Sequence, residues 1–291
     1  MANQTAYQIT ADSACDLPLA LCRERGILPC KMTYTMDGVV MTDEMNEESC
    51  NKFYSLMRAG GTPATSQINP GTFMDFWRPL AEAGRPVLHI SLAASVSGSY
   101  ESALTAVGML QYDYPAWDCR VIDSINGSTG TGLLVLRAAA NRDNGLSLDE
   151  NACDIVGITN NVNSIFTTDT LKYLHRGGRL SRSAAIFGTA LNIQPIMHVH
   201  LDGHIEVWKK VRGEKQCKQK IIDLVKELAI DAPSQTLMVS HADDYAKALE
   251  YGEALKAEVG FRDVYYSTIG PTIGAHAGPG LIAVFFTGKE R

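Results

Sequence analysis

The sequence predicts an α/β fold with two lobes, each built on a largely parallel sheet flanked by helices. Short apolar runs rich in β-formers recur along the chain, and helical segments with apolar residues at three-to-four spacing lie between them. Strands that alternate with helices favour parallel pairing. At 291 residues, with 45% hydrophobic and 20% charged residues, the chain is long enough for one large domain or two lobes.

Six strands and two clear helices support this fold. The strands are expected at 7–10, 86–91, 118–122, 164–168, 236–240 and 263–269, and the helices at 128–141 and 246–258. A β-hairpin is expected in the second lobe, because the runs 195–200 and 204–211 are joined by Leu201-Asp202-Gly203, and Asp-Gly favours a tight turn.

The lobe boundary is expected after residue 158. Gly145 and Ser147 interrupt the helical pattern before a new helix begins. This places an N-terminal lobe at 1–158 and a C-terminal lobe at 159–291, and the segment 60–82 is the part of the first lobe expected to pack with the second.

Charge and composition narrow the function classes. A net charge of −6 disfavours nucleic-acid binding, which normally needs a broad basic face. The first ten residues lack the pattern of a signal peptide and no apolar run is long enough to span a bilayer, so a cytoplasmic protein is expected. The seven cysteines are scattered without a C-x-x-C pair, which disfavours disulfides and a thiolate zinc site.

Four segments of small and polar residues follow expected strands, where α/β folds bind ligands. They are 10–13, 63–67, 95–99 and 270–280. Each segment taken alone fits a helix cap or a turn equally well. The sequence contains no phosphate-binding loop, no dinucleotide-binding glycine motif and no G-x-S-x-G nucleophile elbow, so a nucleotide cofactor is not expected.

The histidines suggest two different uses. His276 lies in the glycine-rich segment 270–280, which is interpreted as a loop that approaches a ligand closely. His198, His200 and His204 have a spacing that a metal site would allow, but no cysteine-rich or carboxylate-rich cluster accompanies them. They are therefore interpreted as half-exposed hairpin residues, and no metal is expected.

Basic residues concentrate in two places. One is Arg176-Gly177-Gly178-Arg179 with Arg182, and the other is the stretch 209–220, which contains Arg212. Such patches in an acidic protein suggest an acidic or phosphate-bearing partner, although a solvated face is the default interpretation of the second.

Seven motifs in order carry a resemblance to a known family. They are ITADSACDLP at 9–18, TSQINPGTF at 65–73, SVSGSYESA at 95–103, VIDS at 121–124, LKYLHRGGRLSRSAA at 171–185, LNIQPI at 191–196 and GPTIGAHAGPG at 270–280. The chain resembles the DegV family of bacterial fatty-acid-binding proteins, which includes the fatty-acid-carrying B subunit of fatty acid kinase. The resemblance spans one DegV domain over about 7–288.

The resemblance implies a buried long-chain fatty acid, such as palmitate, stearate or oleate, with its carboxylate at the lobe interface. It implies carboxylate contacts from Thr65, Ser97 and His276. The supporting pocket would comprise Ser66, Gln67, Gly98, Gly274 and Ala275. It also implies that Arg176, Arg179 and Arg212 lie on the headgroup side or dock a partner.

The implied partner is a separate ATP-binding kinase subunit that phosphorylates the presented carboxylate, while this chain carries the ligand without being an enzyme on its own. Transient membrane contact for ligand exchange fits this role. Two alternatives stay open. One is a lipid-binding regulator without a kinase partner, and the other is a serine esterase with Ser97 or Ser66 as nucleophile and His276 as base, which lacks an evident acidic third member.

Overall fold

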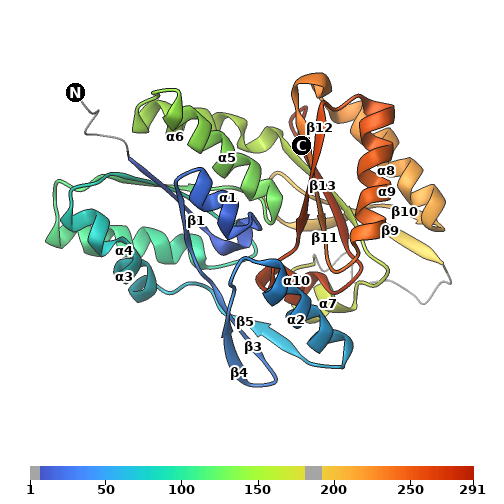
Figure 1. The fold of residues 1–291 in the computed structure, drawn as a ribbon, viewed down its shortest axis with the longest axis horizontal. Helices are drawn as coiled ribbons and strands as arrows, with labels where there is room; N and C mark the ends of the chain where they lie inside the picture. The colour runs from blue at the N-terminus through green and yellow to red at the C-terminus, as the bar shows by residue number, and fades with distance from the viewer. Residues whose placement is uncertain (1–6, 181–191) are drawn as a thin grey trace.

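The computed structural model describes residues 7–180 and 192–291. Two sheets with helices between and outside them form a layered α/β architecture, as Figure 1 shows. The residue Arg182, which belongs to the first basic patch, lies outside the described residues.

The first sheet is parallel throughout, as predicted for the first lobe. Its strands, from edge to edge, are β2 (Ile27–Cys30), β1 (Gln8–Asp12), β6 (Val87–Ser91) and β7 (Cys119–Asp123). One face packs on α3 (Pro70–Glu82) and α4 (Ser99–Asp113), and the other on α5 (Thr129–Asp143) and α6 (Leu148–Ile158). The short helix α1 (Leu19–Glu24) covers the β2 edge. Every parallel strand is thus reached through a helical crossover.

The prediction of a largely parallel second sheet is wrong, because this sheet is mostly antiparallel. Its strands, from edge to edge, are β10 (Ile205–Arg212), β9 (Ile193–Val199), β8 (Val162–Thr167), β13 (Ile282–Thr287), β11 (Thr236–His241) and β12 (Asp263–Thr268). Only β11 and β12 pair in parallel.

The short helix α10 (Pro271–Ala277) explains the reversed direction of β13. Seven helical residues span only about 10 Å, too little to return the chain along a six-residue strand. The strand β13 therefore begins near the end of β12 and runs back against its neighbours. The predicted hairpin is present as β9 and β10, and α8 (Glu214–Leu228) and α9 (Tyr245–Val259) cover the outer face of this sheet.

A third, small sheet was not predicted. It is antiparallel and consists of β4 (Val39–Thr42), β3 (Thr33–Met36) and β5 (Pro63–Thr65). The helix α2 (Glu47–Arg58) follows β4 and packs against α10. This small sheet lies beside α10 in Figure 1, and α10 packs in turn on α7 (Lys172–Arg176), so residue 65 lies next to the C-terminal part of the chain.

The helix α5 joins the two large sheets. It contacts β1 and β6 of the first sheet and β8, β11 and β13 of the second. Glycines let α5 pack closely against its neighbours. A methyl group at Gly130 would lie 2.2 Å from Oδ1 of Asn126, and one at Gly132 would lie 2.9 Å from the carbonyl oxygen of Cys15. The hydroxyls of Thr129 and Ser240 also bond across the interface, 2.7 Å apart.

The predicted lobe boundary after residue 158 falls in the connection between α6, which ends at Ile158, and β8, which begins at Val162. The division of the chain into lobes at this point stays a prediction. Among the described residues, no helix has both the length and the apolar character needed to cross a membrane.

Candidate functional site

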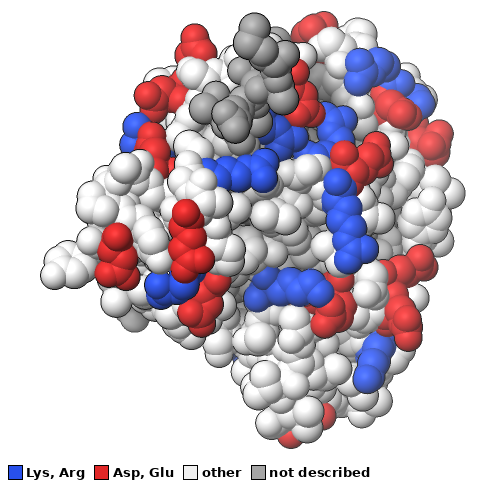
Figure 2. Space-filling view, turned by 60° about the vertical axis from the view of Figure 1, so that its left-hand side comes forward, with Lys and Arg blue, Asp and Glu red and all other residues white. Residues whose placement is uncertain are grey.

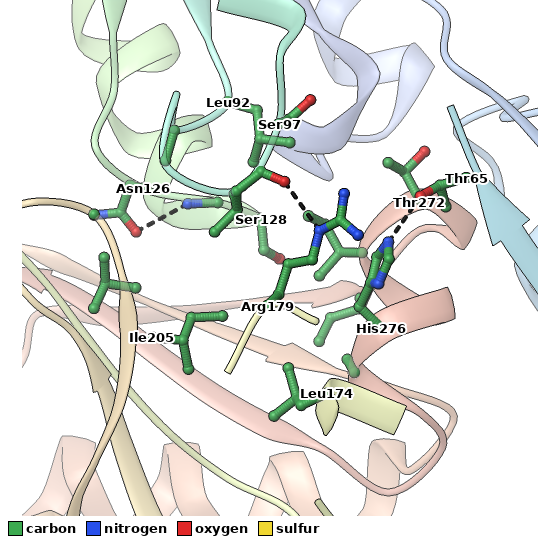
Figure 3. Close-up of a pocket in the computed structure, with 18 of the residues that line it drawn as sticks. Thr65, Leu92, Ser97, Asn126, Ser128, Leu174, Arg179, Ile205, Thr272 and His276 are labelled. Atoms are coloured by element: carbon green, nitrogen blue, oxygen red, sulfur yellow. Dashed lines mark hydrogen bonds between the residues drawn. The ribbon is translucent and has the colours of Figure 1, made fainter. Parts of the chain in front are cut away.

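A cavity of about 290 Å³ is lined by residues from both halves of the chain. Side chains from the ends of the first sheet, from β5, from α10 and from the second sheet line it. Figure 3 shows Thr65, Arg179 and His276 close together at one side of this cavity, with Ser97 above them in this view. Three of the four small-residue segments singled out in the sequence, at 63–67, 95–99 and 270–280, contribute residues to its wall.

The strand β13 provides much of the apolar wall. Ala283 and Phe285 of this strand line the cavity, as does Leu281, the residue just before it. The alternate residues, Ile282, Val284 and Phe286, belong to the core under α8 and α9. Side chains of a strand point alternately to opposite faces, so one strand serves the cavity and the outer core at once.

A hydrogen bond joins two of the predicted carboxylate ligands. Oγ1 of Thr65 lies 2.7 Å from Nε2 of His276. Thr65 ends β5, and His276 lies on α10 rather than in the loop that its glycine-rich surroundings predicted. Pro271 at the first turn and Gly278 at the C-terminal end, with φ of 75°, bound this helix, as expected from proline and glycine at such positions.

The surroundings of the His276 imidazole favour its neutral form. Burial, together with the positive charges of Arg179 and Arg176, lowers the pKa of His276 to about 4. Its Nδ1 faces Gly177, where a methyl group would lie only 2.1 Å away. The glycine in the R-G-G-R motif therefore makes room for the histidine ring.

Ser97 lines the cavity just before α4. Its Oγ lies 3.0 Å from Oγ of Ser99 and accepts a hydrogen bond from the backbone N–H of Ser99 at 3.3 Å. The hydroxyl of Ser99 in turn accepts from the backbone N–H of Ile68 at 3.1 Å. These bonds tie the segment before α4 to the loop after β5.

The other residues of these two loops are also in the cavity wall. Ser66, Gln67 and Gly98 line it. Nε2 of Gln67 donates to Oγ of Ser102 at 3.0 Å, and its amide lies so close to Gly98 that a methyl group there would be 2.1 Å from Oε1. A side chain at position 98 would therefore displace Gln67.

Gly274 and Ala275 are not among the residues that line the cavity. Both are buried in α10, and a methyl group at Gly274 would lie 2.6 Å from the hydroxyl of Tyr54 on α2. The Tyr54 hydroxyl donates to the carbonyl of Ile269 at 2.9 Å. These small residues let α10 pack against α2, and so they position His276 indirectly.

The three predicted arginines have different surroundings. Arg179 lines the cavity, where Nε donates to the carbonyl of Val96 at 3.1 Å and Nη1 to the carbonyl of Gly177 at 2.6 Å. Arg176 is exposed on α7, with its guanidinium 5.3 Å from the ring centre of Tyr173. Arg212 is exposed at the end of β10 and is not in the cavity wall. Figure 2 shows basic side chains gathered near the middle of one face, with acidic ones beside them.

Comparison with known proteins assigns the chain to a family. A model described as an uncharacterised protein of the DegV family matches residues 6–289. The chain belongs to the DegV family. It is 35% identical over 281 residues to a DegV domain-containing protein of Caldanaerobacter subterraneus, covering 97% of this chain and 98% of the relative. A relative from Clostridium perfringens is 31% identical over 286 residues, with 98% of both chains covered.

Solved structures of DegV proteins share this fold. A DegV lipid-binding protein from Thermotoga maritima has a TM-score of 0.85 and 26% identity, with 98% of this chain and 99% of that chain covered. DegV from Bacillus subtilis, a fatty acid binding protein, also has a TM-score of 0.85 and 26% identity, with 97% and 99% covered. The predicted family and its α/β fold are confirmed.

Three buried polar residues of the cavity wall in this DegV protein were not predicted as site residues: Asn126, Ser128 and Thr272. The first two follow β7, another strand that ends at the cavity. Oγ of Ser128 donates to Oδ2 of Asp16 at 2.5 Å, and Nδ2 of Asn126 donates to the carbonyl of Val162 at 3.0 Å. Their position after a strand, in the run Asn126-Gly127-Ser128, was the available signal.

The histidines of the hairpin do not enter the cavity wall, but the turn beside them does. Nδ1 of His200 and of His204 each lie 3.2 Å from Oδ1 of Asp202. Gly203 lines the cavity, and a methyl group there would be 2.6 Å from Oγ of Ser95. Among the described residues, no group of three or more histidine, cysteine or acidic side chains is arranged to hold a metal ion.

Proposed function

We propose that this DegV protein binds one long-chain fatty acid in the cavity and holds its carboxylate with Thr65, Ser97 and His276, where His276 acts through its hydrogen bond to Thr65. The observation that carries this proposal is the bonded pair of Thr65 and His276 at one side of a cavity whose remaining wall is largely apolar. The fatty-acid-binding description of the Bacillus subtilis relative supports the same ligand class.

The hydrogen bonds around Thr65 and Ser97 suit donation to an anion. If His276 donates from Nε2 to Thr65, the hydroxyl hydrogen of Thr65 is free for a carboxylate oxygen. If the hydroxyl of Ser99 donates to Ser97, the hydrogen of Ser97 is free in the same way. This arrangement requires the tautomer of His276 that carries its hydrogen on Nε2.

Arg179 lines the cavity and supplies positive charge beside the carboxylate, whereas burial lowers the pKa of His276 and disfavours its charged form. A carboxylate without partners is costly to bury, whereas hydrogen bonds to a charged group are worth about 1.5–3 kcal/mol each. Two hydroxyls with an adjacent arginine therefore allow the acid to bind in its ionised form.

The acyl chain provides most of the affinity. Each buried methylene is worth about 0.8 kcal/mol. Leu92, Phe166, Leu281 and Phe285 supply apolar wall for it. Palmitate, stearate and oleate are the ligands we propose.

A fluorescent fatty acid, displaced from delipidated protein by palmitate or by its methyl ester, tests this function. We expect palmitate to bind at least tenfold more tightly than the ester, because the ester lacks the charge that the hydroxyls and Arg179 recognise. Equal displacement by both compounds would contradict carboxylate recognition.

We further propose that the protein presents the carboxylate to a separate ATP-dependent kinase subunit, which forms an acyl phosphate. Exposed Arg176 lies within three positions of the cavity residue Arg179, so a partner that docks on Arg176 would be close to the carboxylate. Arg212 is exposed as well and is proposed for the same docking surface. Transient contact with a membrane would load and unload the ligand.

Incubation of the palmitate-loaded protein with ATP and such a kinase subunit tests this role, with the acyl phosphate trapped as a hydroxamate. The charge reversal Arg176→Glu is expected to reduce the product at least fivefold while palmitate affinity is retained. Absence of any hydroxamate would favour the alternative, a lipid-binding regulator that has no kinase partner.

The geometry disfavours the serine esterase. His276 bonds Thr65, whereas Ser97 bonds Ser99, and a histidine with a pKa of about 4 is a weak base at pH 7. A fluorophosphonate probe is therefore expected to leave the intact mass unchanged, and a labelled Ser97 would favour the hydrolase.

A further inference from the structure

The motif at 9–18, all of which the structure describes, contributes no residue to the wall of the fatty-acid cavity. One of its residues, Asp16, is nevertheless bonded to segments that carry wall residues. Asp16 lies after β1 and the short 3₁₀ helix that follows this strand, and its residue surface is 6% exposed. The bonds of this buried side chain show what the motif contributes to the site.

The carboxyl group of Asp16 joins the starts of two helices from different halves of the chain. Its Oδ1 accepts a hydrogen bond from the backbone N–H of Gly270, the residue before α10, at 2.9 Å. Its Oδ2 accepts from the hydroxyl of Ser128, the residue before α5, at 2.5 Å. The hydroxyl of Ser267, near the end of β12, donates to the backbone carbonyl of Asp16 at 2.6 Å. The segment that leads into α10 is therefore held by Asp16 at two points.

An aspartate at this position is unfavourable on two counts. Its φ of 51° lies in the left-handed region, which glycine adopts without a steric penalty. Burial raises the pKa of its carboxyl group well above the ordinary value, because the charged form loses its bonds to water. A glycine at position 16 would avoid both penalties, but it could bond neither Gly270 nor Ser128.

The start of α10 determines where His276 lies. This helix has seven residues and is about 10 Å long, so a displacement of its first residue is passed on to its last turn. Besides its contacts with α2, α10 contacts the 3₁₀ helix at 13–15 that directly precedes Asp16. A shift at Gly270 would therefore disturb the 2.7 Å hydrogen bond between His276 and Thr65.

We propose that Asp16 is a positioning residue for the carboxylate site, because its bond to Gly270 holds α10 where His276 meets Thr65. This inference rests on the proposed function. Asp16 itself is not in the wall of the fatty-acid cavity, so it acts through α10 rather than by touching the ligand. Loss of its bond to Gly270 should weaken recognition of the carboxylate more than binding of the acyl chain.

The substitution Asp16→Ala tests this inference, with palmitate and its methyl ester as paired ligands and circular dichroism to confirm that the protein is folded. We expect palmitate to bind about tenfold more weakly to the variant, and the affinity for the ester to change by less than about threefold. Asp16→Asn keeps an oxygen for the N–H of Gly270 and is expected to restore most of the preference for the acid. A purely structural role would lower the unfolding temperature of Asp16→Ala and leave that preference unchanged.

Gly270→Ala disturbs the same contact from the other side and tests the inference even if Asp16→Ala does not fold. The φ of −70° at Gly270 suits alanine, but the added methyl group would lie 2.8 Å from Oδ1 of Asp16. The carboxyl group would have to move away from the backbone N–H. We therefore expect this variant to lose preference for the acid as Asp16→Ala does.

Asp43→Ala is the matched control, because Asp43 is a second buried carboxyl group close to Gly270. Its bonds to the hydroxyl of Ser13 and to the backbone N–H of Met45 involve no residue of α10 or of the cavity wall, so this variant is expected to keep the preference for the acid.

Three results would each overturn the inference. They are an unchanged preference in Gly270→Ala or in folded Asp16→Ala, no recovery in Asp16→Asn, and an equal loss in Asp43→Ala. A wild-type protein that itself showed no preference for the acid would instead refute the proposed carboxylate site, and the inference with it.

Discussion

Oγ1 of Thr65 lies 2.7 Å from Nε2 of His276, although the two residues are 211 positions apart in the chain. The bond joins β5 of the small sheet to α10, and α10 leads from the last parallel strand of the second sheet into β13. The headgroup side of the cavity is therefore assembled from both halves of the chain, and changes at either partner are expected to affect ligand binding.

Removing only the hydroxyl of Thr65 tests its role in ligand binding without changing the shape of the side chain. Thr65→Val keeps the side-chain shape but cannot bond His276 or a carboxylate, so palmitate affinity is expected to fall about tenfold. Thr35→Val is the control, since Thr35 lies on the adjacent strand β3 and is not in the cavity wall. Calorimetric titration of both variants measures the difference, and equal affinities would count against Thr65.

The pKa of His276 predicts a specific pH dependence. The folded-state pKa of about 4 lies below the ordinary value of 6.5, so between these values the unfolded chain takes up a proton that the folded protein does not. The stability contributed by His276 is therefore present above pH 6.5 and is lost as pH falls towards 4, by at most about 1.4 kcal/mol per pH unit.

This dependence is measured as the difference between the wild type and His276→Gln in urea unfolding at pH 7 and pH 5. Asp43 changes the stability in the opposite direction as the pH falls, because burial raises its pKa to about 6. Since Asp43 is present in both proteins, its contribution cancels in the difference between them. An NMR titration of the His276 ring with a midpoint near 6.5 would contradict the buried, neutral imidazole.

Gly177 is predicted to control the orientation of the His276 ring. Its φ of −73° suits any residue, so the effect of Gly177→Ala arises from the methyl group 2.1 Å from Nδ1. We expect a destabilisation of about 1–3 kcal/mol and at least tenfold weaker palmitate binding.

Gly108→Ala provides the comparison for Gly177→Ala. Gly108 is exposed on α4 with no atom near the added methyl group, so this variant is expected to be about 0.5–1 kcal/mol more stable and to bind normally. A Gly177→Ala protein that behaves like Gly108→Ala would refute the role of this glycine.

The apolar wall is predicted to determine the chain length. Ala283→Leu adds three carbon atoms to the cavity side of β13, so it is expected to weaken stearate binding at least tenfold while laurate is nearly unaffected. A series of saturated acids, with thermal unfolding recorded for each sample, measures the effect. Equal losses along the whole series would indicate a general disturbance of the fold.

Much of the fold followed from local patterns. The strands β1, β6 and β7 of the parallel first sheet and the hairpin of β9 and β10 were predicted correctly, because periodicity and the Asp202-Gly203 turn encode them locally, whereas β2 was not predicted. The antiparallel direction of β13 was not predicted, since it depends on how little distance α10 covers. The strand β5 was also missed, because its three residues carry no periodicity.

The site was predictable in part. Small polar residues after strands indicated the segments of Thr65 and Ser97, and the glycines around His276 indicated a close approach, although the segment proved to be a helix. Pro271 was the signal for that helix. Thr272 was missed because only packing shows that it lines the cavity.

The central claim is that the cavity holds one long-chain fatty acid. Native mass spectrometry of protein purified without delipidation, followed by organic extraction and analysis of the extract, measures this directly. The account predicts one bound ligand per chain with the mass of a C14 to C18 fatty acid, and its loss on extraction. A protein purified from lipid-replete cells that carries no such acid, and binds none when it is added, would contradict the account.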